Sequence, residues 1–123
     1  MFRLLLLLGP LALAACAATP PLPEGRWTGA LTPERHPELK TPVAYDVRYE
    51  GDRLVVAIVG PGGQEVPTRD VRLTPAALVF AFDEPEEGVP LHCVLDRDGD
   101  GGFAGRCTAP DGQWARFTMR PPE

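Results

Sequence analysis

The chain has 123 residues, which is enough for one ordinary domain and too few for two well-packed hydrophobic cores. Its 12 lysines and arginines face 17 aspartates and glutamates, and the resulting net charge of −5 argues against nucleic acid as a partner. The sequence contains no serine, which excludes nucleophilic catalysis of the serine type.

Residues 1–15 have the pattern of an export signal. One basic residue, Arg3, precedes an apolar run, and small residues then lead to Cys16. The apolar run is shorter than the roughly 20 residues that a membrane-spanning helix needs. We therefore predict a signal peptide over residues 1–15 and export of the remaining chain into an oxidising compartment.

The end of this signal, Leu13-Ala14-Ala15-Cys16, resembles the lipobox of bacterial lipoproteins. The resemblance implies cleavage before Cys16, lipidation of that cysteine and stable anchoring in a membrane by its acyl chains. Ala17 is not the aspartate that keeps many such proteins of enteric bacteria in the inner membrane, so an outer-membrane anchor facing the periplasm is expected. Residues 16–24 are predicted as the lipidated cysteine and a proline-rich tether with little fixed structure.

Residues 25–123 are predicted to form one all-β domain. Apolar residues alternate with polar ones in short runs, separated by Gly, Pro and Asp, and no long window has a helical period. Residues 43–50 give the clearest strand, and Gly51-Asp52 predicts a tight turn into a second strand over residues 53–59. Further runs are expected near residues 68–73, 78–82, 91–95, 103–107 and 115–119.

The connections between these runs are mostly short, which favours antiparallel neighbours in an up-and-down meander of about eight strands. Pro67 cannot donate a ladder hydrogen bond and predicts a sheet edge or a bulge. A sheet with one apolar face can close on itself or fold into two layers. We favour a small closed or partly open barrel, and a two-layer β-sandwich is the alternative.

The start of this domain, Gly25-Arg26-Trp27, resembles the G-x-W motif that opens the first strand of lipocalins and related calycin-type barrels. The resemblance implies that Trp27 closes the barrel base beneath a basic residue of the last strand, for which Arg116 or Arg120 is expected. It also implies that the long segment over residues 32–42 lies over the open end as a lid, and this segment has the best claim to partner contact.

Two interpretations compete for residues 93–107. Asp96, Asp98 and Asp100 match the first oxygen positions of an EF-hand-type calcium loop, but the closing position falls on Cys107 instead of glutamate. A hairpin centred on Asp100 instead sets Cys93 opposite Cys107 and leaves a polar, glycine-rich turn between them. We favour the hairpin with a disulfide, and the calcium loop is the weaker alternative.

The remaining polar residues do not predict a catalytic centre. His36 and His92 lie on different predicted elements, and neither has a second ligand at a zinc-binding spacing. The carboxylates of residues 83–87 are best explained as a solvated loop. We therefore predict a non-enzymatic protein without a cofactor or a resident metal.

Three functions agree with these features. The first is a cell-envelope lipoprotein that acts through protein contact, for example by binding or inhibiting an envelope enzyme. The second is lipocalin-like binding of a small apolar ligand or lipid, although bulky inward side chains are expected to fill much of an eight-stranded barrel. The third is a structural or accessory lipoprotein.

Overall fold

The computed structural model describes residues 19–123, in which every regular element is a β-strand. No helix in this part of the chain is long and apolar enough to cross a membrane. The signal sequence and Cys16 lie outside the described residues. The strands are β1 (Gly25–Pro33), β2 (Thr41–Glu50), β3 (Arg53–Val59), β4 (Glu65–Pro67), β5 (Arg69–Leu73), β6 (Ala77–Asp83), β7 (Pro90–Arg97), β8 (Phe103–Thr108) and β9 (Trp114–Arg120).

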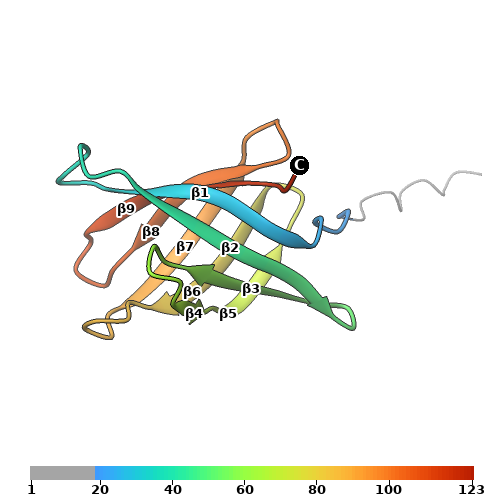
Figure 1. Cartoon of the computed structure of the whole chain (residues 1–123), viewed down its shortest axis with the longest axis horizontal. Coiled ribbons are helices and arrows are strands. Elements are labelled where there is room, and N and C mark those ends of the chain that lie inside the picture. The colour runs from blue at the N-terminus through green and yellow to red at the C-terminus, as the bar shows by residue number, and fades with distance from the viewer. Residues whose placement is uncertain (1–18) are drawn as a thin grey trace, which may run out of the picture.

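The nine strands form one antiparallel sheet in the order β4-β3-β2-β1-β9-β8-β7-β6-β5. The first and last strands pair with each other, with Gly29 opposite Met119, so the meander curls round into a barrel (Figure 1). The two edge strands, β4 and β5, are consecutive in the chain, and β3 also contacts β5. The barrel is therefore nearly closed, as predicted, and the two-layer sandwich is excluded.

A short strand that was not predicted, β4, precedes the strand predicted near residues 68–73, which accounts for nine strands where about eight were expected. Pro67 ends β4, and the Thr68 hydroxyl donates a hydrogen bond to the Val56 carbonyl at 2.6 Å. Asp70 then has a positive φ of 56°, and the β5–β6 register shifts between Arg69 and Arg72. This bulge turns the chain from the edge of β3 to the edge of β6.

The predicted alternation is confirmed by burial. In β2, Val43, Tyr45 and Val47 are buried, and the residues between them are less covered. The largest fully buried side chains are Trp27, Tyr45, Phe80 and Phe103. Every second residue of β2 therefore faces the barrel interior, whereas the last four residues of β3 are all buried.

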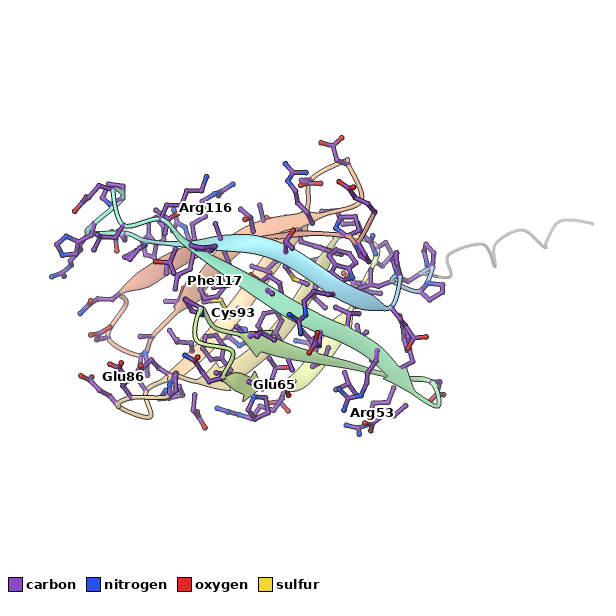
Figure 2. The ribbon with its side chains drawn as sticks, viewed as in Figure 1. Arg53, Glu65, Glu86, Cys93, Arg116 and Phe117 are labelled. Atoms are coloured by element: carbon purple, nitrogen blue, oxygen red, sulfur yellow. A yellow bond between two sulfur atoms is a disulfide. The ribbon has the colours of Figure 1, made fainter. Side chains whose placement is uncertain are left out.

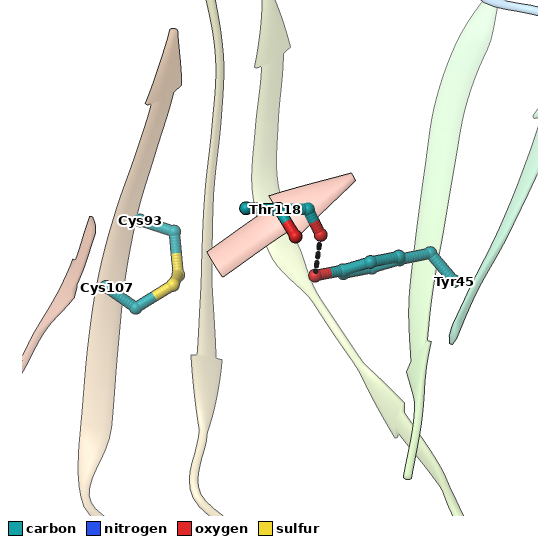
Figure 3. The surroundings of a disulfide bond; sticks show 4 residues. All are labelled: Tyr45, Cys93, Cys107 and Thr118. Carbon is teal, nitrogen blue, oxygen red and sulfur yellow. Dashed lines mark hydrogen bonds between the residues drawn. A yellow bond between two sulfur atoms is a disulfide. The ribbon is translucent and has the colours of Figure 1, made fainter. Parts of the chain in front are cut away.

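Two inward-facing glycines allow the sheet to bend sharply. A Cβ atom at Gly29 would lie 1.8 Å from the Thr118 carbonyl oxygen, and one at Gly105 would lie 2.0 Å from the Val94 oxygen. The ring of Tyr45 packs beside Gly29, and its hydroxyl donates a 2.9 Å hydrogen bond to the Thr118 carbonyl (Figure 3). Burial raises the pKa of Tyr45, so the phenol keeps its proton and this bond even where an exposed tyrosine would ionise.

The disulfide prediction is confirmed. Cys93 on β7 is directly opposite Cys107 on β8, as the hairpin centred near Asp100 required. The two residues form a disulfide across a sequence separation of 14, and both are fully buried (Figure 3). The link joins neighbouring strands inside the barrel wall.

The expectation of little fixed structure before the domain is wrong for its last residues. Leu22 is only 6% exposed and belongs to the hydrophobic core. Its backbone N–H donates to the Tyr49 hydroxyl at 3.0 Å, and the Trp27 indole N–H donates to the Pro23 carbonyl at 2.9 Å. Burial of the Leu22 side chain and these two hydrogen bonds hold residues 22 and 23 against the barrel.

Candidate functional site

The two ends of the barrel are built differently. At the end where β1 begins, Leu22, Trp27 and Phe103 are buried, and the Trp27 and Phe103 rings lie 6.0 Å apart. This end, which we call the closed end, also receives the N-terminal segment (Figure 1). The opposite end, the open end, is surrounded by the connections over residues 34–40, 60–64, 84–89 and 109–113.

The open end contains a cavity of about 380 Å³, which we call the mouth cavity. The side chains of Phe82 and Phe117 form part of its lining, with ring centroids 6.0 Å apart in an edge-on arrangement. Ala115, one inward position nearer the start of β9 than Phe117, is small and leaves space above this aromatic pair at the open end. The cavity is therefore a cup in the outer part of the barrel, and the inner part is filled with side chains.

Three prolines border the mouth cavity: Pro33 at the end of β1, Pro61 in the β3–β4 connection and Pro85 in the β6–β7 connection. A proline offers an apolar ring, has no N–H to satisfy and holds its φ angle fixed. The border of the cup is consequently apolar and has limited conformational freedom before any ligand arrives.

The charge near the mouth cavity is negative. Glu84 lines the cavity, and its carboxylate accepts hydrogen bonds from the backbone N–H groups of Glu86 and Glu87 at 3.0 and 2.6 Å. Figure 2 shows Glu86 on this same loop at the open end. No lysine or arginine is among the cavity's lining residues in the described part of the chain. An anionic ligand would therefore meet carboxylates and no opposite charge.

Of the predicted lid over residues 32–42, only Pro33 and Thr41, near its two ends, line this cavity. None of residues 34–40 lines it, and the Glu34 N–H donates to the Trp114 carbonyl at 3.1 Å. This bond continues the pairing of β1 with β9 by one residue, and the rest of the segment then extends past the ends of these two strands. Leu39, at the far side of the segment, is 54% exposed.

The predicted stacking of Arg116 or Arg120 on Trp27 is also wrong. Trp27 is fully buried inside the barrel, whereas Arg116 and Arg120 are exposed on the outer side of β9. Figure 2 shows Arg116 on the outer surface, away from Phe117 in the interior. Because side chains alternate along a strand, the inward positions of Phe117 and Met119 force both arginines outward. Gly25 and Trp27 lie at the start of β1, and the buried Trp27 ring packs beside Phe103.

The three aspartates of the weaker calcium hypothesis lie at the end of β7 and in the β7–β8 turn. Oδ1 of Asp98 accepts hydrogen bonds from the backbone N–H groups of Asp100 and Gly102, at 2.9 and 3.1 Å. Asp96 lies on β7, opposite Ala104 of β8. Within residues 19–123, no three His, Cys, Asp or Glu side chains are grouped so that they could hold a metal ion.

Sequence reasoning missed a feature on the outer face of the barrel. The Arg106 guanidinium lies over the Trp114 ring, 4.0 Å from its centre. A groove follows the same face and is lined by Lys40, Arg116 and Arg120. The outward parity of these positions on β8 and β9 was readable from the sequence, but their neighbours across the sheet depended on the β1–β9 pairing.

No protein-family model matches this chain, and no curated protein matches its sequence. Its structure is similar to that of a redesigned beta barrel, with a TM-score of 0.62 and 19% identity over 81% of this chain and 91% of that one. At this identity the likeness shows the fold alone. The chain is thus a small antiparallel β-barrel protein.

Proposed function

We propose that this protein is a non-enzymatic binding protein whose mouth cavity accepts a small, neutral apolar ligand. The observation that carries the proposal is the apolar cup of about 380 Å³ at the open end. Small-molecule sites typically occupy about 300–1,000 Å³ and are lined mainly by hydrophobic side chains. Of the functions predicted from the sequence, lipocalin-like ligand binding has the most direct geometric support.

The depth of the cup limits the size of the ligand. Phe80 and Tyr45 fill the barrel further inside, and both are fully buried. A ligand therefore fits only between the Phe82–Phe117 pair and the proline border. This favours a short alkyl chain or a single ring system over a long acyl chain that would need the full length of the barrel.

The charge of the border sets the ligand's polarity. A carboxylate entering beside Glu84 would lose hydration without gaining a cationic partner. We therefore expect the full chain to bind 1-octanol at least about tenfold more tightly than octanoate at pH 7, measured by isothermal titration calorimetry. Octanoate binding as tight as octanol binding would contradict the neutral preference.

Three variants test the position and the charge preference of this binding. Ala115→Phe places a ring in the cup and should weaken octanol binding by at least about tenfold, whereas Ala81→Phe adds the same ring to the outer face of β6 and should not. Gln64→Lys adds a cation at the border and should strengthen octanoate binding several-fold. Equal effects of the two phenylalanine variants, with both folded by circular dichroism, would place the ligand elsewhere.

We also propose that Cys16 is lipidated and anchors the protein in the cell envelope. The support is the lipobox resemblance at residues 13–16. Because Leu22 docks at the closed end, a lipid on Cys16 would leave the open end on the side away from the tether. Incorporation of labelled palmitate into the wild-type chain, and its loss in Cys16→Ala, is the expected result.

A further inference from the structure

We propose that the outer face of β8, β9 and β1 binds an extended acidic segment of a partner protein. The feature that we call the basic groove is lined by the cations Lys40, Arg116 and Arg120, and its volume is about 640 Å³. Between the cations lie the small outward residues Ala30, Ala104 and Thr118. This surface is distinct from the mouth cavity, which faces the barrel interior.

The floor of the basic groove suits an extended chain. Thr118 of β9 lies opposite Ala30 of β1 on one side and Ala104 of β8 on the other. Side chains this small allow a bound backbone to approach the sheet closely. Arg116 and Arg120 lie on either side of Thr118 along β9, so the row of small residues lies between two cations.

None of the three cations of the groove forms an ion pair within the described residues, although the chain as a whole has a net charge of −5. Asp98 is the one carboxylate that lines the groove. Hydrogen bonds from the backbone N–H groups of Asp100 and Gly102, together with the nearby Arg120, lower the pKa of Asp98, whose main contacts are within its own turn. The groove is thus a positive surface on a negative protein.

A second observation comes from the strand pairing beside the groove. Arg106 of β8 lies directly opposite Arg116 of β9 on the outer face. Like charges at directly opposed positions destabilise an antiparallel pair, and the stacking of Arg106 on Trp114 leaves Arg116 without a compensating contact of that kind. An anionic partner would convert the repulsion between these arginines into attraction for its carboxylates.

The surface next to Arg106 has the composition of a protein-binding site. Arg106 stacks on Trp114. Val94 of β7, which lies opposite Arg106, is 41% exposed. Tryptophan and arginine are enriched among the residues that dominate protein–protein binding energy. This favours a protein segment, with an apolar side chain on Val94 and Trp114, over a bare anion.

The spacing of the cations defines the partner sequence. Arg116 and Arg120 are four residues apart on one strand face, which corresponds to about 13 Å in extended backbone. An extended partner presents its own residues at the same interval on one face. The expected recognition element is therefore a pair of acidic residues with three small or β-branched residues between them.

Fluorescence anisotropy with the full chain tests this proposal. The probe is a fluorescein-labelled peptide with two glutamates separated by Thr-Val-Thr, and the control peptide has the same composition with adjacent glutamates. We expect the spaced peptide to bind at least about fivefold more tightly, and Arg116→Glu with Arg120→Glu to weaken it by at least about tenfold. Arg72→Glu, an exposed arginine on β5, is the matched control and should change binding less than about twofold.

Several outcomes would overturn the proposal. Equal affinity for the two peptides, or equal weakening by Arg72→Glu, would show general electrostatic attraction instead of a site. Tighter binding to phosphatidylglycerol vesicles than to the peptide, lost in the same double variant, would assign the groove to a membrane surface. Arg116→Gln is a second variant for the case in which the double variant does not fold. It removes the repulsion between Arg106 and Arg116, so its melting temperature should be unchanged or higher than that of the wild type.

Discussion

Gly29→Val is expected to lower the free energy of unfolding by about 3 kcal/mol, because the pairing of β1 with β9 has no space for a side chain there. A Cβ atom would lie 1.8 Å from the Thr118 carbonyl oxygen and 3.2 Å from the Tyr45 ring. The nearest obstacle is backbone, so it cannot move aside as a flexible side chain would. The strands would have to separate at the seam that closes the barrel, with loss of the Tyr45–Thr118 hydrogen bond. Urea unfolding followed by far-ultraviolet circular dichroism measures the change.

Ala30→Val is the matched control, because it adds two methyl groups at the next residue of β1, on the outer face. It should change stability by less than about 0.5 kcal/mol. A Gly29→Val protein as stable as Ala30→Val would show that β1 and β9 do not approach as closely as the structure has them. Gly105→Val should repeat the Gly29 effect, since its Cβ would lie 2.0 Å from the Val94 oxygen.

The fold was largely predictable because its main determinant is local. Alternation in β2 identifies the buried face directly, and the short turn at Gly51 makes β3 its neighbour. The hairpin register that set Cys93 opposite Cys107 follows from symmetry about the polar turn. These signals need only residues that are close in sequence.

The failures of prediction share a different cause, which is dependence on contacts distant in sequence. Leu22 is buried because Tyr49 and Trp27 offer it a packed position, and no local pattern records this. The chain changes direction at the Asp70 bulge because β3 offers an edge for β4 to pair with and β6 offers an edge for β5. In each case the outcome was decided by a partner element that local periodicity does not reveal.

The same distinction between local signals and distant contacts applies to the candidate sites. The outward direction of Arg116 follows from parity, and that rule alone contradicts its predicted stacking on buried Trp27. The mouth cavity is different, because its volume depends on Ala115 being small where Phe82 and Phe117 meet from separate strands. The basic groove likewise needs β1 beside β9 before Lys40 and Arg116 face one surface.

Removal of the disulfide should have the second large effect on stability. Cys93 and Cys107 close a loop of about 15 residues, for which the chain-entropy model gives roughly 3 kcal/mol. For a domain of about 100 residues this corresponds to a fall in melting temperature on the order of 15 °C. The double variant Cys93→Val with Cys107→Val tests the crosslink with little loss of packing, because valine fills similar space at both buried positions.

Comparison with Cys93→Ala and Cys107→Ala separates the crosslink from the packing around it. The alanine variant loses the same crosslink and also leaves a cavity between β7 and β8, so it should be less stable than the valine variant by about 1 kcal/mol or more. Thermal unfolding of each protein, with and without reductant, measures the contribution of the crosslink and that of the packing separately. Reductant should lower the wild-type melting temperature toward that of the valine variant and leave the two double variants unchanged. A valine variant that melts within about 2 °C of the oxidised wild type would show that the register of β7 and β8 is set by pairing and packing alone, with no contribution from the link.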